Sequence, residues 1–98
     1  MKKTFKLTAP NKTPERQTDS VKFEIRKYIA RERRKILPEG VDFWDFDCKM
    51  GDSPDNAIPI HVSEINKKID GVVQEKKETF YLEVLAKPGR RIRKPKEE

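Results

Sequence analysis

The chain has 98 residues, a length that suits one small domain and leaves no room for a second. Charged residues make up 41% of the composition and apolar residues 34%, and the mean hydropathy is −0.95, so we expect a folded domain with a thin core. No apolar run approaches the roughly 18 residues of a membrane span, so we expect no membrane segment. No apolar leader follows the first lysines, and the single cysteine cannot form a disulfide within the chain. Both observations favour a cytoplasmic protein.

The first two predicted elements are a strand and a long helix. Alternation of apolar and polar residues over Thr4–Thr8 predicts the strand. The helix has two candidate starts, at Thr13 followed by Pro14 and at Thr18, and Pro38 stops it. Its predicted buried stripe has helical spacing and consists of Val21, Ile25, Tyr28, Ile29 and Ile36.

The middle of the chain predicts a second strand and then a loop. Alternation over Val41–Met50 indicates a strand whose inward face carries Trp44, so we expect Trp44 to be buried between sheet and helices. The following residues, 51–59, are rich in Asp, Ser, Pro and Asn, a composition typical of loops. A brief extended piece at 60–62 would add one more strand to the sheet.

The last predicted elements are a helix that Ser63 caps and a strand over Thr79–Lys87. The order β-α-β-(β)-α-β favours an α+β fold, a two-layer sandwich with two helices on one face of a three- or four-stranded sheet. We expect one domain over residues 1–88. The basic stretch 89–98 has too little apolar content to pack, so it is predicted to be a disordered tail.

The net charge of +6 hides a strong segregation along the chain. Residues 20–37 have a net charge of +5, residues 38–60 a net charge of −5, and residues 87–98 a net charge of +4. Two interpretations are open from the sequence. Either the acidic and basic segments pair with each other across the fold, or the helix and the tail present a basic surface to a polyanion.

Five segments carry a family resemblance: Arg26-Lys27-Tyr28, Arg31-Glu32-Arg33-Arg34-Lys35, the run from Leu37 to Lys49, His61-Val62, and Leu85-Ala86-Lys87-Pro88-Gly89. They resemble a family of small bacterial proteins that has no assigned function. The segments are spread over nearly the whole chain, so the resemblance implies a stand-alone domain. It implies no catalytic residue, ligand or partner.

No residue pattern indicates catalysis, and we expect a non-enzymatic protein without a metal or cofactor. Cys48 falls on the predicted inward face, where a thiol stays protonated and inert. His61 directly precedes the second predicted helix, where its ring can hydrogen-bond near the helix start. Asp45 and Asp47 project from one face of a strand and either hold a cation or pair with basic residues, and we favour pairing.

The leading functional hypothesis is a binding module for RNA or another polyanion, engaged by the first helix and the tail. Its predicted contacts are the basic side chains of Arg26, Arg31, Arg33, Arg34, Lys35, Arg90, Arg91, Arg93 and Lys94. The alternative is a protein–protein adaptor that uses Phe43 and Tyr81, two aromatic residues expected to be exposed beside acidic residues on the outer face of the sheet. Oligomeric state cannot be derived from this sequence.

Overall fold

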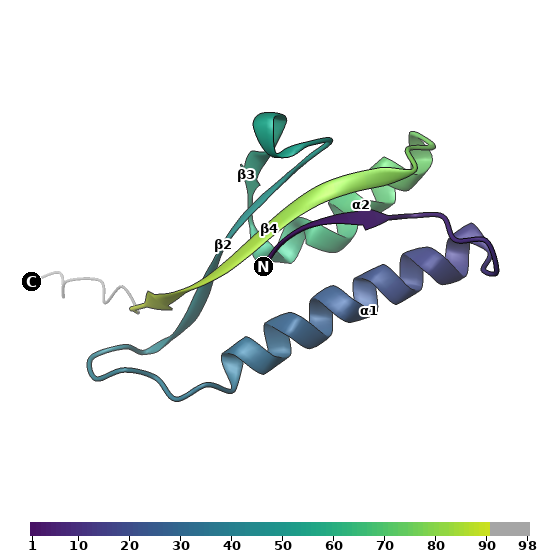
Figure 1. Cartoon of the computed structure of the whole chain (residues 1–98). Coiled ribbons are helices and arrows are strands. Elements are labelled where there is room, and N and C mark those ends of the chain that lie inside the picture. Colours follow the sequence, from purple (N-terminus) through teal and green to yellow (C-terminus); the bar gives the residue numbers. More distant parts are fainter. Residues whose placement is uncertain (91–98) are drawn as a thin grey trace, which may run out of the picture.

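The computed structural model describes residues 1–90 and has a four-stranded antiparallel sheet with both helices packed on one face (Figure 1). The strands are β1 (Lys2–Lys6), β2 (Phe43–Gly51), β3 (Ile58–Ile60) and β4 (Thr79–Gly89). The helices are α1 (Pro14–Arg33) and α2 (Ile65–Gln74), with short 3₁₀ turns η1 (Pro54–Asn56) and η2 (Val62–Glu64). This arrangement confirms the predicted two-layer α+β sandwich and shows that the sheet has its fourth strand. The position predicted for that strand, 60–62, is wrong, because β3 begins at Ile58, inside the predicted loop, and Val62 already belongs to η2.

The strand order is β1-β4-β2-β3, so β4 lies in the interior of the sheet. On one side β4 pairs with β1, with Phe80 opposite Phe5. On its other side β4 pairs with β2 along nine residue pairs, including Val84 opposite Cys48. Because β4 is antiparallel to both neighbours, β1 and β2 run in the same direction, and α1 connects them across the helical face of the sheet.

The hydrophobic core lies between the sheet and the two helices. Phe5 and Phe80 stack in it with ring centroids 5.3 Å apart. Both helices and three strands contribute buried residues to one cluster, which consists of Phe5, Leu7, Val21, Ile25, Phe46, Cys48, Met50, Ile65, Ile69, Phe80, Leu82 and Val84. A single layer of contacts therefore stabilises the fold, as the composition predicted.

Helix α1 begins at the first of the two predicted starts but ends earlier than predicted. Thr13 is the N-cap, and its Oγ1 accepts a hydrogen bond from the Arg16 N–H at 3.3 Å. At the other end, Pro38 disfavours a helical conformation for the residue before it and offers no N–H to the preceding turn. The helix already stops at Arg33, five residues before Pro38, and the predicted burial of Ile36 is wrong, because 93% of this residue is exposed.

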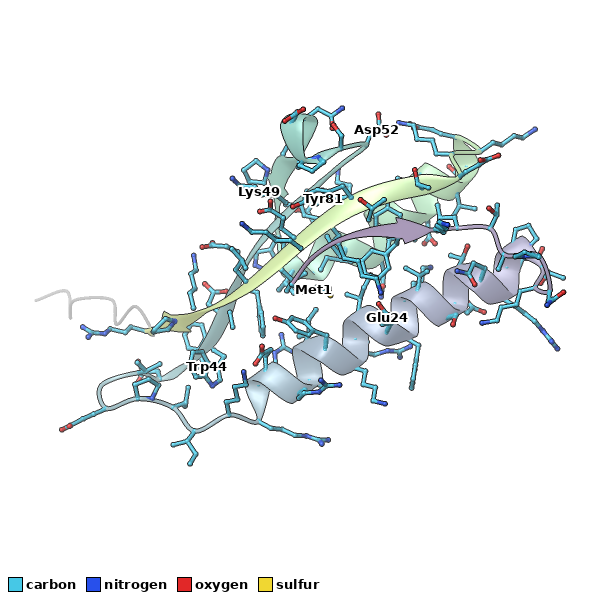
Figure 2. The ribbon with its side chains drawn as sticks, in the orientation of Figure 1. Met1, Glu24, Trp44, Lys49, Asp52 and Tyr81 are labelled. Carbon is cyan, nitrogen blue, oxygen red and sulfur yellow. The ribbon has the colours of Figure 1, made fainter. Side chains whose placement is uncertain are left out.

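Trp44 lies at the end of the core, beside the C-terminal end of α1 (Figure 2). It is half-buried, so the prediction of a buried Trp44 is wrong. Its indole N–H donates to the backbone oxygen of Lys35 at 2.9 Å, and this bond holds the chain where it leaves the helix. The indole lies near the surface because its N–H bonds to the Lys35 carbonyl, which follows the end of α1 and accepts no hydrogen bond within the helix.

The start of the second helix differs from the prediction in its cap. His61 takes the N-cap position of η2, and its Nδ1 accepts a hydrogen bond from the Ser63 N–H at 3.1 Å. In return, the Glu64 carboxylate accepts from the His61 N–H at 3.1 Å. The expectation that His61 hydrogen-bonds near the helix start is confirmed, whereas the assignment of the cap to Ser63 is wrong.

Strand β4 continues through Pro88 to Gly89, two residues beyond the predicted end. The Val84 N–H points toward β1 and donates to the oxygen of Met1 at 2.8 Å. Because N–H directions alternate along a strand, the nitrogen of Pro88 faces the same side, but beyond the first residue of β1, which runs antiparallel to β4. A proline is tolerated there because no strand within residues 1–90 pairs with that side of Pro88 and requires an N–H from it. Residues 91–98 of the predicted tail lie outside the described residues.

Candidate functional site

Helix α1 presents a basic row of side chains on the side away from the sheet. Its inward side carries the buried Val21 and Ile25, so residues about half a turn away point toward solvent. Helical spacing aligns four cations and two apolar residues there. We call this row the outer stripe, and it consists of Phe23, Arg26, Lys27, Ala30, Arg31 and Arg34. These side chains line an open hollow of about 550 Å³.

Two acidic residues of α1 within the span of the outer stripe, Glu24 and Glu32, are turned toward other partners, whereas Asp19, one turn before Phe23, is exposed and forms no ion pair within residues 1–90. Glu24 lies between α1 and β1 (Figure 2), where its Oε2 is 2.8 Å from the Nζ of Lys3. Glu32 pairs with the Lys35 ammonium at 2.5 Å, and hydrogen bonds from Lys35 and then Tyr28 lower the pKa of the Glu32 carboxyl. Within residues 1–90, the four cations of the outer stripe form no ion pair.

Phe23 is the aromatic member of the outer stripe, and 59% of it is exposed. Phe23 is not among the contacts predicted from the sequence, because it does not belong to the buried stripe of the helix. A signal was nevertheless present: Phe23 precedes Arg26 by three residues and Lys27 by four, so all three share one side of an amphipathic helix.

Two of the predicted cationic contacts are engaged elsewhere in the structure. The Arg33 guanidinium lies over the Phe46 ring, 5.4 Å from its centroid, and so covers the edge of the core. The Lys35 ammonium neutralises Glu32. The other three predicted contacts on the helix lie together on the outer stripe, namely Arg26, Arg31 and Arg34.

The C-terminal ends of β4 and α1 lie at the same end of the molecule (Figure 1), and Arg90 directly follows β4. The loop after α1 runs along the end of β4, where the Asp42 N–H donates to the oxygen of Gly89 at 3.0 Å. In that loop Gly40 has a φ of +81°, and the Arg90 guanidinium packs 3.9 Å from the place that a Cβ of residue 40 would take. The other predicted contacts in the tail, Arg91, Arg93 and Lys94, lie outside the described residues.

A second hollow lies between α1 and the start of α2 and has a volume of about 430 Å³. Its cationic rim consists of Lys22, Arg26 and Arg33. Lys22 is paired with Asp70 at 2.5 Å, and Arg33 lies on the Phe46 ring. Arg26 therefore supplies the uncompensated charge of this groove, and it also belongs to the outer stripe.

A third hollow, of about 490 Å³, lies between α2 and β3, but its charges balance. The Lys77 ammonium is 2.7 Å from Asp52 and 3.3 Å from Glu75. The charged residues that line this groove are Asp52, Glu64, Glu75, Lys67, Lys68 and Lys77. Three acids opposite three bases give no preference for an anionic or a cationic ligand.

The two aromatic residues of the predicted adaptor surface are occupied by contacts within the sheet. Tyr81 lies on the side of the sheet away from α1 (Figure 2) but is only 6% exposed, so the prediction that it is exposed is wrong. Its hydroxyl donates to Glu83 at 2.7 Å, which raises the pKa of Tyr81 to about 12. Phe43 is 38% exposed, and its ring covers Gly89 so closely that a Cβ there would lie 2.4 Å from a ring carbon.

Asp45 and Asp47 share one cationic partner. The Lys87 ammonium is 2.6 Å from Asp47 Oδ1 and 4.0 Å from Asp45 Oδ2, and the bond to Asp47 raises the pKa of Lys87. The favoured interpretation of these aspartates as paired is therefore confirmed. In the part of the chain that the structure describes, no group of three or more His, Cys, Asp and Glu side chains is placed to hold a metal ion.

We expect the Cys48 thiol of the folded chain to resist alkylation. The residue is 3% exposed, and burial, followed by the charges of Asp47 and Asp45, raises the pKa of its thiol to about 11 from 9.0. At pH 8 the folded chain should therefore react with iodoacetamide roughly 100-fold more slowly than the same chain in denaturant, since only the thiolate reacts. Mass spectrometry of timed samples gives both rates, and equal rates would place Cys48 outside the core.

A family model described as a family of unknown function, DUF6172, matches residues 1–95 of the chain. No curated protein and no solved structure matches it. Neither helix of residues 1–90 combines the length and the apolar character needed to cross a bilayer.

Proposed function

The chain belongs to DUF6172, a family of unknown function, and we propose that it is a non-enzymatic module that binds RNA or a comparable polyanion through the outer stripe. The observation that carries this proposal is the charge on the stripe: four cations in three turns of helix, without an acid among them or an ion pair within residues 1–90. An uncompensated row of this kind attracts phosphates, since it concentrates positive potential on one surface.

The types of residue in the stripe support phosphate as the ligand. Three of the four cations are arginines, whose planar guanidinium groups can bind phosphate oxygens with two parallel hydrogen bonds. Several cations elsewhere in the fold are neutralised by carboxylates, as Lys3, Lys22 and Lys87 illustrate. The four cations of the outer stripe instead lie together along one side of a single helix and form no ion pair within residues 1–90.

The position of Arg90 supports a contribution from the end of the chain. The C-terminal ends of β4 and α1 lie at the same end of the molecule (Figure 1), and the Arg90 guanidinium packs beside Gly40 in the loop between α1 and β2. A strand of nucleic acid that follows the outer stripe toward its C-terminal end would therefore approach Arg90. The helix and Arg90 can act on one extended ligand.

The adaptor hypothesis has less support. It depends on an aromatic pair that a partner can reach, but Tyr81 is buried and bound to Glu83, and Phe43 rests on Gly89. The acidic residues beside them, Asp45 and Asp47, are shared with Lys87. These side chains already have partners within the sheet, so they offer little to a second protein.

The decisive experiment is a salt titration of binding. The full-length chain should bind a fluorescent single-stranded RNA, and the logarithm of the affinity should fall linearly with that of the salt concentration between about 50 and 200 mM. The expected slope is about −2 to −3, because each phosphate contact on a single strand contributes roughly 0.7. An uncharged peptide nucleic acid of the same sequence is the control. Absence of salt-sensitive binding at the lowest salt would overturn the proposal.

A further inference from the structure

We infer that the outer stripe recognises single-stranded nucleic acid, with an unpaired base stacked on Phe23 and the adjoining phosphates on Arg26 and Lys27. This inference rests on the polyanion-binding role proposed above and specifies its ligand. Its basis is Phe23, the aromatic side chain of the outer stripe, because attraction of phosphates alone requires no aromatic ring.

Phe23 contributes little to the stability of the fold. It is 59% exposed, and it lies outside the core cluster that Val21 and Ile25 join from the same helix. An aromatic ring left in water on the polar side of a helix forgoes the gain in free energy that burial of its apolar surface would give. A ligand that covers the ring would recover part of that gain.

The surroundings of the ring select the kind of ligand. Arg26 and Lys27 lie one turn further along the same side of α1, and residues at these spacings have Cβ atoms about 5–6 Å apart. One more turn on, Ala30 contributes only a methyl group, so the hollow stays open between Phe23 and Arg34. The hollow thus has an aromatic wall, a small-residue floor and a cationic rim.

A nucleotide of a single strand matches each of these parts. Its base offers a flat face to Phe23, and its phosphate offers oxygens to the cations one turn away. A duplex hides the faces of its bases between neighbouring pairs, so a phenyl ring on the convex surface of a helix cannot stack on them. A polyanion without bases, such as polyphosphate, gains only from the cations.

The test compares two strands of equal charge. A short oligothymidine and an abasic strand with the same number of phosphates are titrated into the full-length chain at low salt. If a base stacks on Phe23, the oligothymidine should bind about 10-fold more tightly, within the range known for base–aromatic stacking. A duplex of the same length should bind no more tightly than the abasic strand once the affinities are corrected for the number of phosphates in each ligand.

The Phe23→Leu variant assigns the difference to the ring. It should bind oligothymidine about as weakly as the abasic strand, with the abasic affinity and the salt slope unchanged, whereas Phe23→Tyr should keep the preference. Circular dichroism melting checks that both variants fold, which the exposure of the site favours. The matched control is Ile58→Ala, at an apolar side chain that is 61% exposed on β3 and should leave both affinities unchanged.

The outcomes separate this inference from the proposal on which it rests. Equal binding of the two strands with a steep salt dependence overturns the stacking role of Phe23 and leaves the polyanion-binding role in place. A Phe23→Leu variant that loses affinity for both strands equally also overturns stacking, because the ring then only positions the arginines. No salt-sensitive binding of either strand removes the polyanion-binding role and the inference together.

Discussion

Replacement of Phe80 by alanine is expected to lower the free energy of unfolding by about 3–5 kcal/mol, which is most of the stability of a domain of this size. Phe80 is 1% exposed and lies on β4, the strand between β1 and β2. Its ring stacks on Phe5 from β1 at 5.3 Å, so its loss leaves a cavity where the first and last strands meet. The core is a single layer and has few other contacts to compensate.

Urea denaturation followed by Trp44 fluorescence measures this loss. The control is Leu85→Ala on the same strand, at a residue that is 42% exposed on the outer face, and it should change the free energy of unfolding by about 0.5 kcal/mol or less. A loss below about 1 kcal/mol for Phe80→Ala would contradict the core described above, because buried phenylalanines rarely cost so little.

The triple replacement Arg26→Gln, Arg31→Gln and Arg34→Gln is expected to weaken RNA binding about 100- to 1,000-fold near 50 mM salt. If each arginine neutralises one phosphate, the salt slope should become shallower by about 2. If the variant and the original chain bind equally at about 1 M salt, this difference in slope amounts to about 100- to 1,000-fold in affinity near 50 mM salt. Arg33 is left unchanged because it covers Phe46 in the fold. Fluorescence anisotropy with the same RNA over a range of salt concentrations measures the affinity and the slope.

The matched control removes the same charge from other surfaces. Lys12, Lys67 and Lys68 lie outside the outer stripe and form no ion pair within residues 1–90, and their joint replacement by glutamine also lowers the net charge by three. This variant should retain binding to within about 10-fold, since distant charges are screened over a Debye length of roughly 10 Å. Equal losses in the two triple variants would mean that net charge, rather than the stripe, governs binding.

Hydrophobic periodicity was sufficient to predict both helices and the strands β1, β2 and β4 in their order, whereas β3 (Ile58–Ile60) lies mostly within the segment predicted to be a loop. The helical spacing of Val21 and Ile25 and the alternation along β2 and β4 identified the faces that form the core. The errors lie where a local signal depends on the tertiary context. Pro88 ends a strand in most settings, but here its nitrogen faces a side that β1 does not reach.

Side-chain exposure was harder to predict than secondary structure. Alternation places Tyr81 on the outer face of the sheet, where it was expected to be exposed, yet only 6% of it is exposed. Its partner on β2 is Gly51, and its hydroxyl donates a hydrogen bond to Glu83. Ile36 continues the apolar spacing of α1, but the helix ends at Arg33, before that spacing can place it on the core. Both errors arise because burial is decided by which segments pack together, and a single sequence does not specify this.

The candidate site could be predicted only in part. Sequence patterns located the basic helix, but they could not show that Lys35 is neutralised by Glu32 or that Arg33 covers an aromatic ring. The spacing of Phe23 to Arg26 and Lys27 places the three residues on one side of the helix, but this signal is weak, since a lone exposed apolar residue is common on protein surfaces. Its position among unpaired cations becomes evident only in the structure, which shows that Glu24 pairs with Lys3 and Glu32 with Lys35 rather than with the cations of the outer stripe.

The interior position of β4 has a consequence for the order in which the sheet forms. Among the described elements β4 comes last in the chain, yet it is the strand that joins β1 to the remainder of the sheet. During synthesis, β2 and β3 can already form a hairpin, whereas β1 has no strand partner until residues 79–83 have left the ribosome. The edges of β1 and β2 that pair with β4 therefore stay unpaired until β4 has been synthesised. Pairing between segments so far apart in the chain is intrinsically slow to form.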